Sequence, residues 1–198
     1  MRPRNCLGTR WARASVGAVV LFLSPLSSAL AQVEHITVYA DASGSSCSIA
    51  DLTPALFTLF VLHTNVYHAI AVNLSVTESA GFSATFVEED IPFYHVGTFR
   101  DGVTVVYDEC IFSTPFLIGT ITYQGYGTSE TCSMLDTSGN PNWGEPTPYP
   151  ITNACTFAWY PAPSAGPLYI NPSPECSPPC VVKTESSTWG RVKALYRH

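Results

Sequence analysis

The stretches TLFVLH (Thr58–His63) and IAVNLSVT (Ile70–Thr77) decide the fold class of this chain. The first is a continuous apolar run, which is typical of a strand buried on both faces. In the second, apolar and polar side chains alternate from Val72 to Thr77, which predicts a strand with one face in a core and the other toward solvent. Both patterns are typical of β-strands.

Similar short runs recur on both sides of these two stretches. They are HITVYA, FSATFVEE, GVTVVY, FLIGTITYQGY, TFAWY and PLYI, separated by turn-forming segments such as DASGSS, FRDG, TSGNPN and PAPSAGP. One further segment, IADLTPALF, has room for a single helical turn before Pro54. Short strands separated by turns at short intervals predict an all-β fold, an immunoglobulin-like antiparallel β-sandwich.

The first 31 residues have the pattern of a secretory signal peptide. Four arginines and no acid precede an apolar run at 14–23, and Ala29 and Ala31 supply the small residues of a cleavage site. About ten apolar residues are too few to span a bilayer, which needs roughly 20. We therefore expect cleavage before Gln32 and no transmembrane segment in the mature chain, which would be secreted or held at the cell surface.

Charge excludes one class of partner. Removal of residues 1–31 leaves five basic and fifteen acidic residues, a net charge of −10. Arg100 is the one base before Cys180, and the others lie near the C-terminus. An acidic body repels phosphates, so we expect no nucleic-acid partner.

Six cysteines remain after cleavage, and an even number in an exported chain predicts a disulfide framework. They are Cys47, Cys110, Cys132, Cys155, Cys176 and Cys180. The sequence leaves the pairing open, and local closure of Cys176 with Cys180 in CSPPC is one alternative. No spacing of zinc-finger type appears, so we expect no metal and no cofactor.

Prolines and aromatic residues are concentrated in residues 141–180, which contain eleven prolines. Proline withholds a ladder donor, so this stretch predicts edge strands and fixed loops. Trp143, Tyr149, Trp159 and Tyr160 are candidates for a site that grips sugar rings. The alternative, which we favour, is that these rings cover sheet edges.

Candidates for catalysis and calcium binding are weak. GSSC and GFSAT lack the G-x-S-x-G pattern of a nucleophile elbow. His63, His68 and His95 fit hydrogen-bonded core or rim positions better than a catalytic pair, and the acids at 88–90 and 108–109 fit a solvated rim better than glycosidase carboxylates.

The loop DASGSSCSIAD places Asp41, Ser43, Ser45 and Asp51 near one another in the sequence. It departs from a calcium loop, because its glycine is misplaced and Leu52 stands where a bidentate glutamate is needed. A serine-rich turn is the favoured reading.

Because none of the catalytic candidates has a recognisable pattern, we expect no catalytic residues and no enzyme.

The stretches VYADASGSSCSI, LFTLFVLH, YINPSPEC and TWGRVKALYR together resemble exported bacterial proteins of unknown function from uncultured lineages. The resemblance implies a secreted β-sandwich and supplies no catalytic residues. The closing segment resembles C-terminal segments that recur on otherwise different exported proteins, which implies a shared sorting signal.

Residues 181–198 read as a linker followed by a short amphipathic basic helix. Its apolar face has helical spacing and consists of Trp189, Val192, Leu195 and Tyr196. A helix of about ten residues is marginal alone, so this face needs a docking surface, either on the acidic body or on an envelope component.

These observations predict three segments: a signal peptide at 1–31, a disulfide-stapled sandwich at 32–180 and the tail at 181–198. The expected function is a noncatalytic secreted or envelope-associated protein whose partner is an envelope component or a glycan. A carbohydrate-binding module is the first alternative, and an extracellular hydrolase is the second.

Overall fold

The structure is a computed structural model that describes residues 33–144 and 147–176. The chain divides into two units at Ala31 and Gln32, and every described residue belongs to the second unit. The predicted signal peptide and tail helix lie outside the described residues, so both stay predictions. In the described part of the chain, no helix is long and apolar enough to span a membrane.

The described residues form an all-β sandwich, as the sequence predicts. Its strands are β1 (His35–Tyr39), β2 (Ser48–Ile49), β3 (Pro54–Thr64), β4 (Ala69–Glu78), β5 (Thr85–Asp90), β6 (Tyr94–Thr98), β7 (Gly102–Ile111), β8 (Phe116–Tyr126), β9 (Ser133–Ser138), β10 (Ile151–Ala154), β11 (Trp159–Pro161) and β12 (Leu168–Ile170). The helical turn expected before Pro54 is absent, because β3 already begins at that residue and pairs it with Tyr126.

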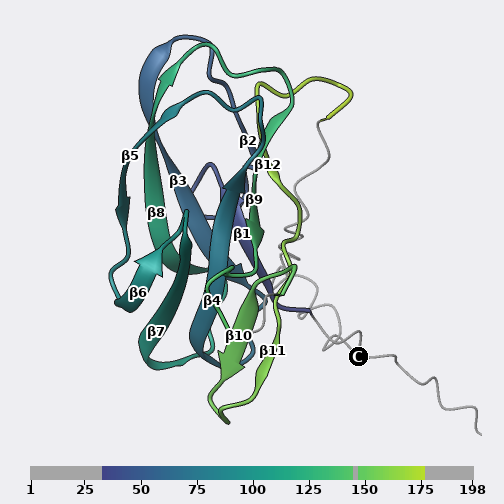
Figure 1. Ribbon diagram of the computed structural model, residues 1–198. Helices are drawn as coiled ribbons and strands as arrows, with labels where there is room; N and C mark the ends of the chain where they lie inside the picture. Colours follow the sequence, from purple (N-terminus) through teal and green to yellow (C-terminus); the bar gives the residue numbers. More distant parts are fainter. Residues whose placement is uncertain (1–32, 145–146, 177–198) are drawn as a thin grey trace, which may run out of the picture. The chain divides into compact units, whose positions relative to one another are not determined.

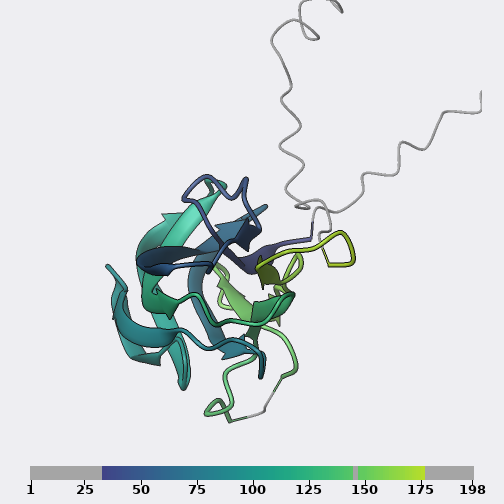
Figure 2. The ribbon, with the colours of Figure 1, turned by 90° about the horizontal axis from the view of Figure 1, so that it is seen from above.

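Two sheets make up the sandwich (Figures 1 and 2). The first has the strand order β1-β3-β8-β5. The second runs β11-β10-β4-β9-β12-β2, and the β6–β7 hairpin joins it through pairing of β7 with β4. Strand pairing is antiparallel except between β12 and β2, whose parallel pairing corrects the purely antiparallel expectation.

One edge of β4 pairs with two strands in succession. Ser138, the last residue of β9, pairs with Ser75, and Ile151, the first residue of β10, pairs with Asn73. The two strands therefore continue one another along β4, and residues 139–150 form an excursion inserted between them. This insertion carries Trp143 and Tyr149.

The core lies between the sheets and is built from the inward faces of the predicted strands. Val72, Leu74 and Val76 of β4 are buried in it, as the alternation predicts. The polar face of β4 is not open to solvent, however, because Asn73 and Ser75 are buried as well. The side chain of Asn73 donates to Thr104, and the Ser75 hydroxyl donates to the carbonyl of Gly139, where the insertion leaves the sheet.

Two disulfides join segments that are distant in the sequence. Cys110 bonds Cys155, and Cys132 bonds Cys176, with Cα–Cα distances of 5.9 and 5.8 Å. Cys47 is also disulfide-bonded, while Cys180 lies outside the described residues. Local closure of Cys176 with Cys180 is therefore wrong.

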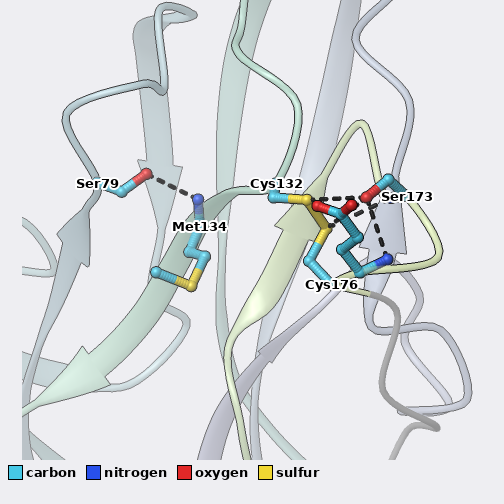
Figure 3. Close-up of a disulfide and its surroundings, with 6 residues drawn as sticks. Ser79, Cys132, Met134, Ser173 and Cys176 are labelled. Atoms are coloured by element: carbon cyan, nitrogen blue, oxygen red, sulfur yellow. Dashed lines mark hydrogen bonds between the residues drawn. A yellow bond between two sulfur atoms is a disulfide. The ribbon is translucent and has the colours of Figure 1, made fainter.

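The segment after β12 explains the Cys132–Cys176 pairing, because it returns past the start of β9. The N–H of Cys132 donates to the carbonyl of Asn171, and the Ser173 hydroxyl contacts the sulfur atoms of both cysteines (Figure 3). Backbone and disulfide together hold this last described segment against the sheet.

Candidate functional site

The four aromatic residues singled out in the sequence line one pocket. Trp143 and Tyr149 come from the insertion, and Trp159 and Tyr160 come from the edge strand β11. The pocket has a volume of about 290 Å³, and Thr147, Ile151 and Pro161 complete its lining. This volume is near the lower limit for small-molecule sites and suits a ligand the size of a single ring.

Two tryptophans form one wall of the pocket. Their ring centroids are 5.0 Å apart, and the ring planes are tilted by 56°. Trp159 and Tyr149 keep 39% and 37% of their surface exposed. The rings are therefore neither buried in the core nor fully solvated. Their partial exposure leaves apolar faces open to a ligand.

Strand register explains why the insertion and β11 meet. Asn153 of β10 pairs with Trp159 on one side and with Ala71 of β4 on the other, so their side chains share the outer face of the second sheet. Trp143 and Tyr149 of the insertion meet Ile151 and Trp159 at the pocket on this same face. Asn153 Oδ1 is buried there and has no hydrogen-bond partner in the part of the chain that the structure describes.

The pocket connects to a buried polar network through Tyr160. Its hydroxyl donates to Glu34 Oε1 over 2.9 Å, and the Tyr67 N–H donates to the same oxygen over 2.8 Å. Burial and the bond to Glu34 raise the pKa of Tyr160. Burial also raises the pKa of Glu34, but hydrogen bonds led by that from His63 outweigh it, so the pKa lies below its usual value. Glu34 therefore stays ionised inside the sandwich.

His63 is the second titratable partner of Glu34 in this network. Its Nε2 lies 3.0 Å from Glu34 Oε2, and its Nδ1 lies 3.4 Å from the hydroxyl of Tyr107. The His63 ring is completely buried, and burial raises the pKa of Tyr107 well above its usual range. A histidine and a carboxylate within hydrogen-bonding distance resemble part of a catalytic set. No surface of the His63 ring is open to a substrate, so the pair acts as a core hydrogen-bond network, as the sequence reading favours.

The remaining histidines and acids do not join this network. His95 lies on the edge strand β6 and contacts the carbonyl of Phe93, while the ring of His68 packs edge-on against Tyr67. Glu89 accepts a hydrogen bond from the N–H of Phe99, and burial raises its pKa. Glu88 and Asp90 are exposed neighbours on β5. The acids of β5 therefore form a rim, with one of them anchoring the β6–β7 turn.

The loop that partly matches a calcium site forms a serine-rich turn. The Asp41 carboxylate accepts hydrogen bonds from the backbone and hydroxyls of Ser43 and Ser45. Asp51 points elsewhere and accepts from the N–H groups of Gly127 and Ser129. Within residues 33–144 and 147–176, no three metal-ligating side chains gather. The favoured reading of this loop is confirmed.

Sequence reasoning missed several residues of the pocket and the network. Thr147, Ile151 and Pro161 lie in the proline-rich stretch, which was the available signal for the pocket. Glu34 had a weaker signal, since a lone acid immediately before a buried strand needs a partner. The proposed tail-docking residues Trp189, Val192, Leu195 and Tyr196 lie outside the described residues.

Comparison with known proteins identifies the fold and no family. No family model matches the sequence, and no curated protein matches it. Among solved structures, the sixth cohesin of scaffoldin B from Acetivibrio cellulolyticus, in complex with a Cel5 dockerin, is similar with a TM-score of 0.50 and 9% identity, over 71% of this chain and 99% of that chain. A type II cohesin domain from the cellulosome of the same organism gives a TM-score of 0.49 and 8% identity, over 70% and 95%. At such identity the likeness shows a β-sandwich of the cohesin type.

Proposed function

We propose that this chain is a noncatalytic, exported binding module whose aromatic pocket holds a sugar ring of a surface or extracellular glycan. The observation that carries the proposal is the convergence of Trp143, Tyr149, Trp159 and Tyr160 around one pocket of about 290 Å³. Trp143 and Tyr149 come from an insertion and Trp159 comes from an edge strand, so covering a single strand does not by itself account for the arrangement. The side chain of Tyr160, the next residue of β11, points the other way and bonds to Glu34.

The pocket has the chemistry that a sugar requires. Pyranose rings present C–H groups on their faces and hydroxyls at their edges, so they bind between exposed aromatic rings flanked by a few polar groups. The partly exposed Trp159 and Tyr149 supply the apolar surface. The hydroxyl of Thr147, which donates to the carbonyl of Tyr149, places a polar group in the lining.

A noncatalytic role is supported by the burial of the one histidine–carboxylate pair that approaches a catalytic geometry, His63 with Glu34. The similar cohesin from Acetivibrio cellulolyticus is bound to a dockerin, so a β-sandwich of this kind can work through its surface. That likeness extends to the fold alone, and the pocket supports the proposed ligand class.

The test is binding of a glycan panel, followed by intrinsic tryptophan fluorescence and calorimetry. Trp159→Ala should weaken the affinity for a bound glycan by roughly tenfold or more, equivalent to about 1.4 kcal/mol. Tyr126→Ala is the matched control, because Tyr126 is 48% exposed and does not line the pocket. Equal losses in both variants, or turnover of a glycan by the wild-type protein, would contradict the proposal.

We also propose that the basic tail holds the module at the cell envelope, as its sequence and its resemblance to recurring C-terminal segments suggest. Deleting Thr188–His198 should release the protein from the envelope fraction while its melting temperature stays nearly unchanged. A much lower melting temperature would instead place Trp189 in the packing of the domain.

A further inference from the structure

Strand β6 is an open edge of the second sheet. It pairs with β7 along one side, and no other described strand pairs with it. Tyr94 and Val96 are 70% and 63% exposed, and both lie on the face that they share with Val106 of β7. Such a strand presents a row of N–H and C=O groups that are ready to pair with another strand.

The other edges of the sandwich carry features that block pairing. β5 is irregular between Phe86 and Glu88 and carries acids at 88–90. β11 has three residues and ends at Pro161, and β2, at the far end of the second sheet, has only two residues. Residues 163–165 cover β1, where the N–H of Ala165 donates to Thr37. Charges, irregular pairing, prolines and covering segments are the usual means by which proteins block strand addition. β6 contains no charged residue and no proline.

The β6 edge is held firmly in place. Phe99, in the turn that follows β6, is completely buried in the core, and its N–H donates to Glu89 while its carbonyl accepts from the N–H of Val76. Gly97 has a φ of +96°, and a Cβ at this position would collide with the Gly102 carbonyl oxygen, so the hairpin requires glycine there. A preorganised edge loses little conformational entropy when a further strand is added.

The surroundings of β6 are acidic. Glu88 and Asp90 are exposed on β5, which lies on the same side of the sandwich as β6 (Figure 1), and Asp101 is exposed in the turn after β6. Arg100 is the one arginine among the described residues, which include no lysine, and it already lies 3.6 Å from Glu78 and over the ring of Phe86. A second copy of this acidic chain would therefore meet repulsion, whereas a basic segment would be attracted.

We propose that β6 is a docking edge for an extended segment of a partner protein, which adds to the second sheet as a further strand. The segment carries β-branched or apolar side chains at alternate positions, where they pack against Tyr94 and Val96, and it has basic residues at its ends. Main-chain pairing supplies affinity, and the alternate side chains supply selectivity. This site is separate from the aromatic pocket and does not depend on the sugar proposal.

The experiment is an NMR titration of the isotope-labelled unit Gln32–His198 with the peptide acetyl-KKTVTVTKK-amide. Strand addition by a short peptide is weak, so the titration extends to about 1 mM. We expect saturable shifts centred on the β6 amides and slower hydrogen exchange at that edge. A peptide N-methylated at alternate residues and one with glutamates in place of the lysines should each bind at least about tenfold more weakly.

Two valine variants test the location. Val96→Lys places a charge on β6 and should weaken peptide binding at least about tenfold. Val87→Lys is the matched control, because Val87 is a 47% exposed valine on β5, another edge strand, and binding should persist. Melting temperatures confirm that both variants fold. The proposal would be overturned if no peptide bound up to about 1 mM, if the methylated peptide bound equally well, or if the shifts were centred away from β6. It would also be overturned if the free chain formed a dimer in sedimentation that Val96→Lys dissociates.

Discussion

Removing the Cys110–Cys155 disulfide gives the sharpest test of how this sandwich is held together. The bond joins the end of β7 to the turn between β10 and β11 across a separation of 45 residues. Closing a loop of that length lowers the entropy of the unfolded chain, and the loss is worth about 4 kcal/mol at 25 °C. The double variant Cys110→Ala/Cys155→Ala should therefore be less stable by about that amount.

Urea denaturation followed by circular dichroism measures this difference. In thermal unfolding, each kcal/mol of lost stability lowers the melting temperature of a domain of this size by about 2–4 °C, so we expect the melting temperature to fall by roughly 8–16 °C. Cys132→Ala/Cys176→Ala is the matched control, because its cysteines are 44 residues apart and the loop-closure contribution is nearly the same.

The two variants should differ at the pocket. Cys155 lies in the turn that leads to Trp159, whereas Cys132 and Cys176 lie near the start of β9. Tryptophan fluorescence and glycan binding should change in the first variant and much less in the second. A loss below about 1 kcal/mol in the first variant would refute the reasoning, since it would mean that the crosslink does not constrain the unfolded chain.

Three further predictions concern single residues. Phe99→Ala should cost about 3–5 kcal/mol in urea denaturation because the side chain is completely buried, whereas Phe112→Ala, at a 69% exposed residue, should change stability by less than about 0.5 kcal/mol. Burial raises the pKa of Asp41, but hydrogen bonds from Ser43 and Ser45 lower it to about 2. Folding thus favours the ionised form of Asp41. The stability that this carboxylate adds is present above its usual pKa of 3.8 and is lost as the pH falls toward 2. Asp41→Asn should therefore flatten the pH dependence of the unfolding free energy in that range. Phe157 has a φ of 63° at the tip of the β10–β11 hairpin and is 77% exposed. Asparagine adopts this left-handed conformation more readily, so Phe157→Asn should raise the free energy of unfolding by about 1 kcal/mol. A lower melting temperature would show that contacts of the Phe157 ring outweigh the backbone strain.

Local patterns were enough to predict the all-β class and eight of the twelve strands that the structure describes, but they missed β2, β6, β9 and β10. Alternation and continuous apolar runs each reflect which side of a strand faces water, and that information is contained in a few neighbouring residues. The inward position of Val72 and Leu74 and the all-β class followed from it. Proline content likewise indicated that residues after 140 form short strands and loops, because a missing N–H acts at its own position. Of the described strands there, only β11 is an edge strand, since β10 and β12 pair on both sides.

Long-range features were beyond the reach of local patterns. Asn73 and Ser75 are buried where they bond to Thr104 and to Gly139, residues far along the chain, and no local pattern in β4 indicates these partners. The partner of Cys176 depends on where the segment after β12 passes β9, so sequence proximity to Cys180 was misleading.

The sequence by itself determined the class of the fold, the acidic body and which side chains were available for binding or catalysis. Tertiary structure alone decided which of them meet. Trp143 and Trp159 became neighbours because β9 and β10 continue one another along β4 and leave the insertion over the face that β11 borders. His63 became inaccessible because Glu34 and Tyr107 approach it from other strands inside the core. Strand pairing decides these contacts, because it fixes the register between residues far apart in the chain. A pattern in the sequence describes only one strand at a time.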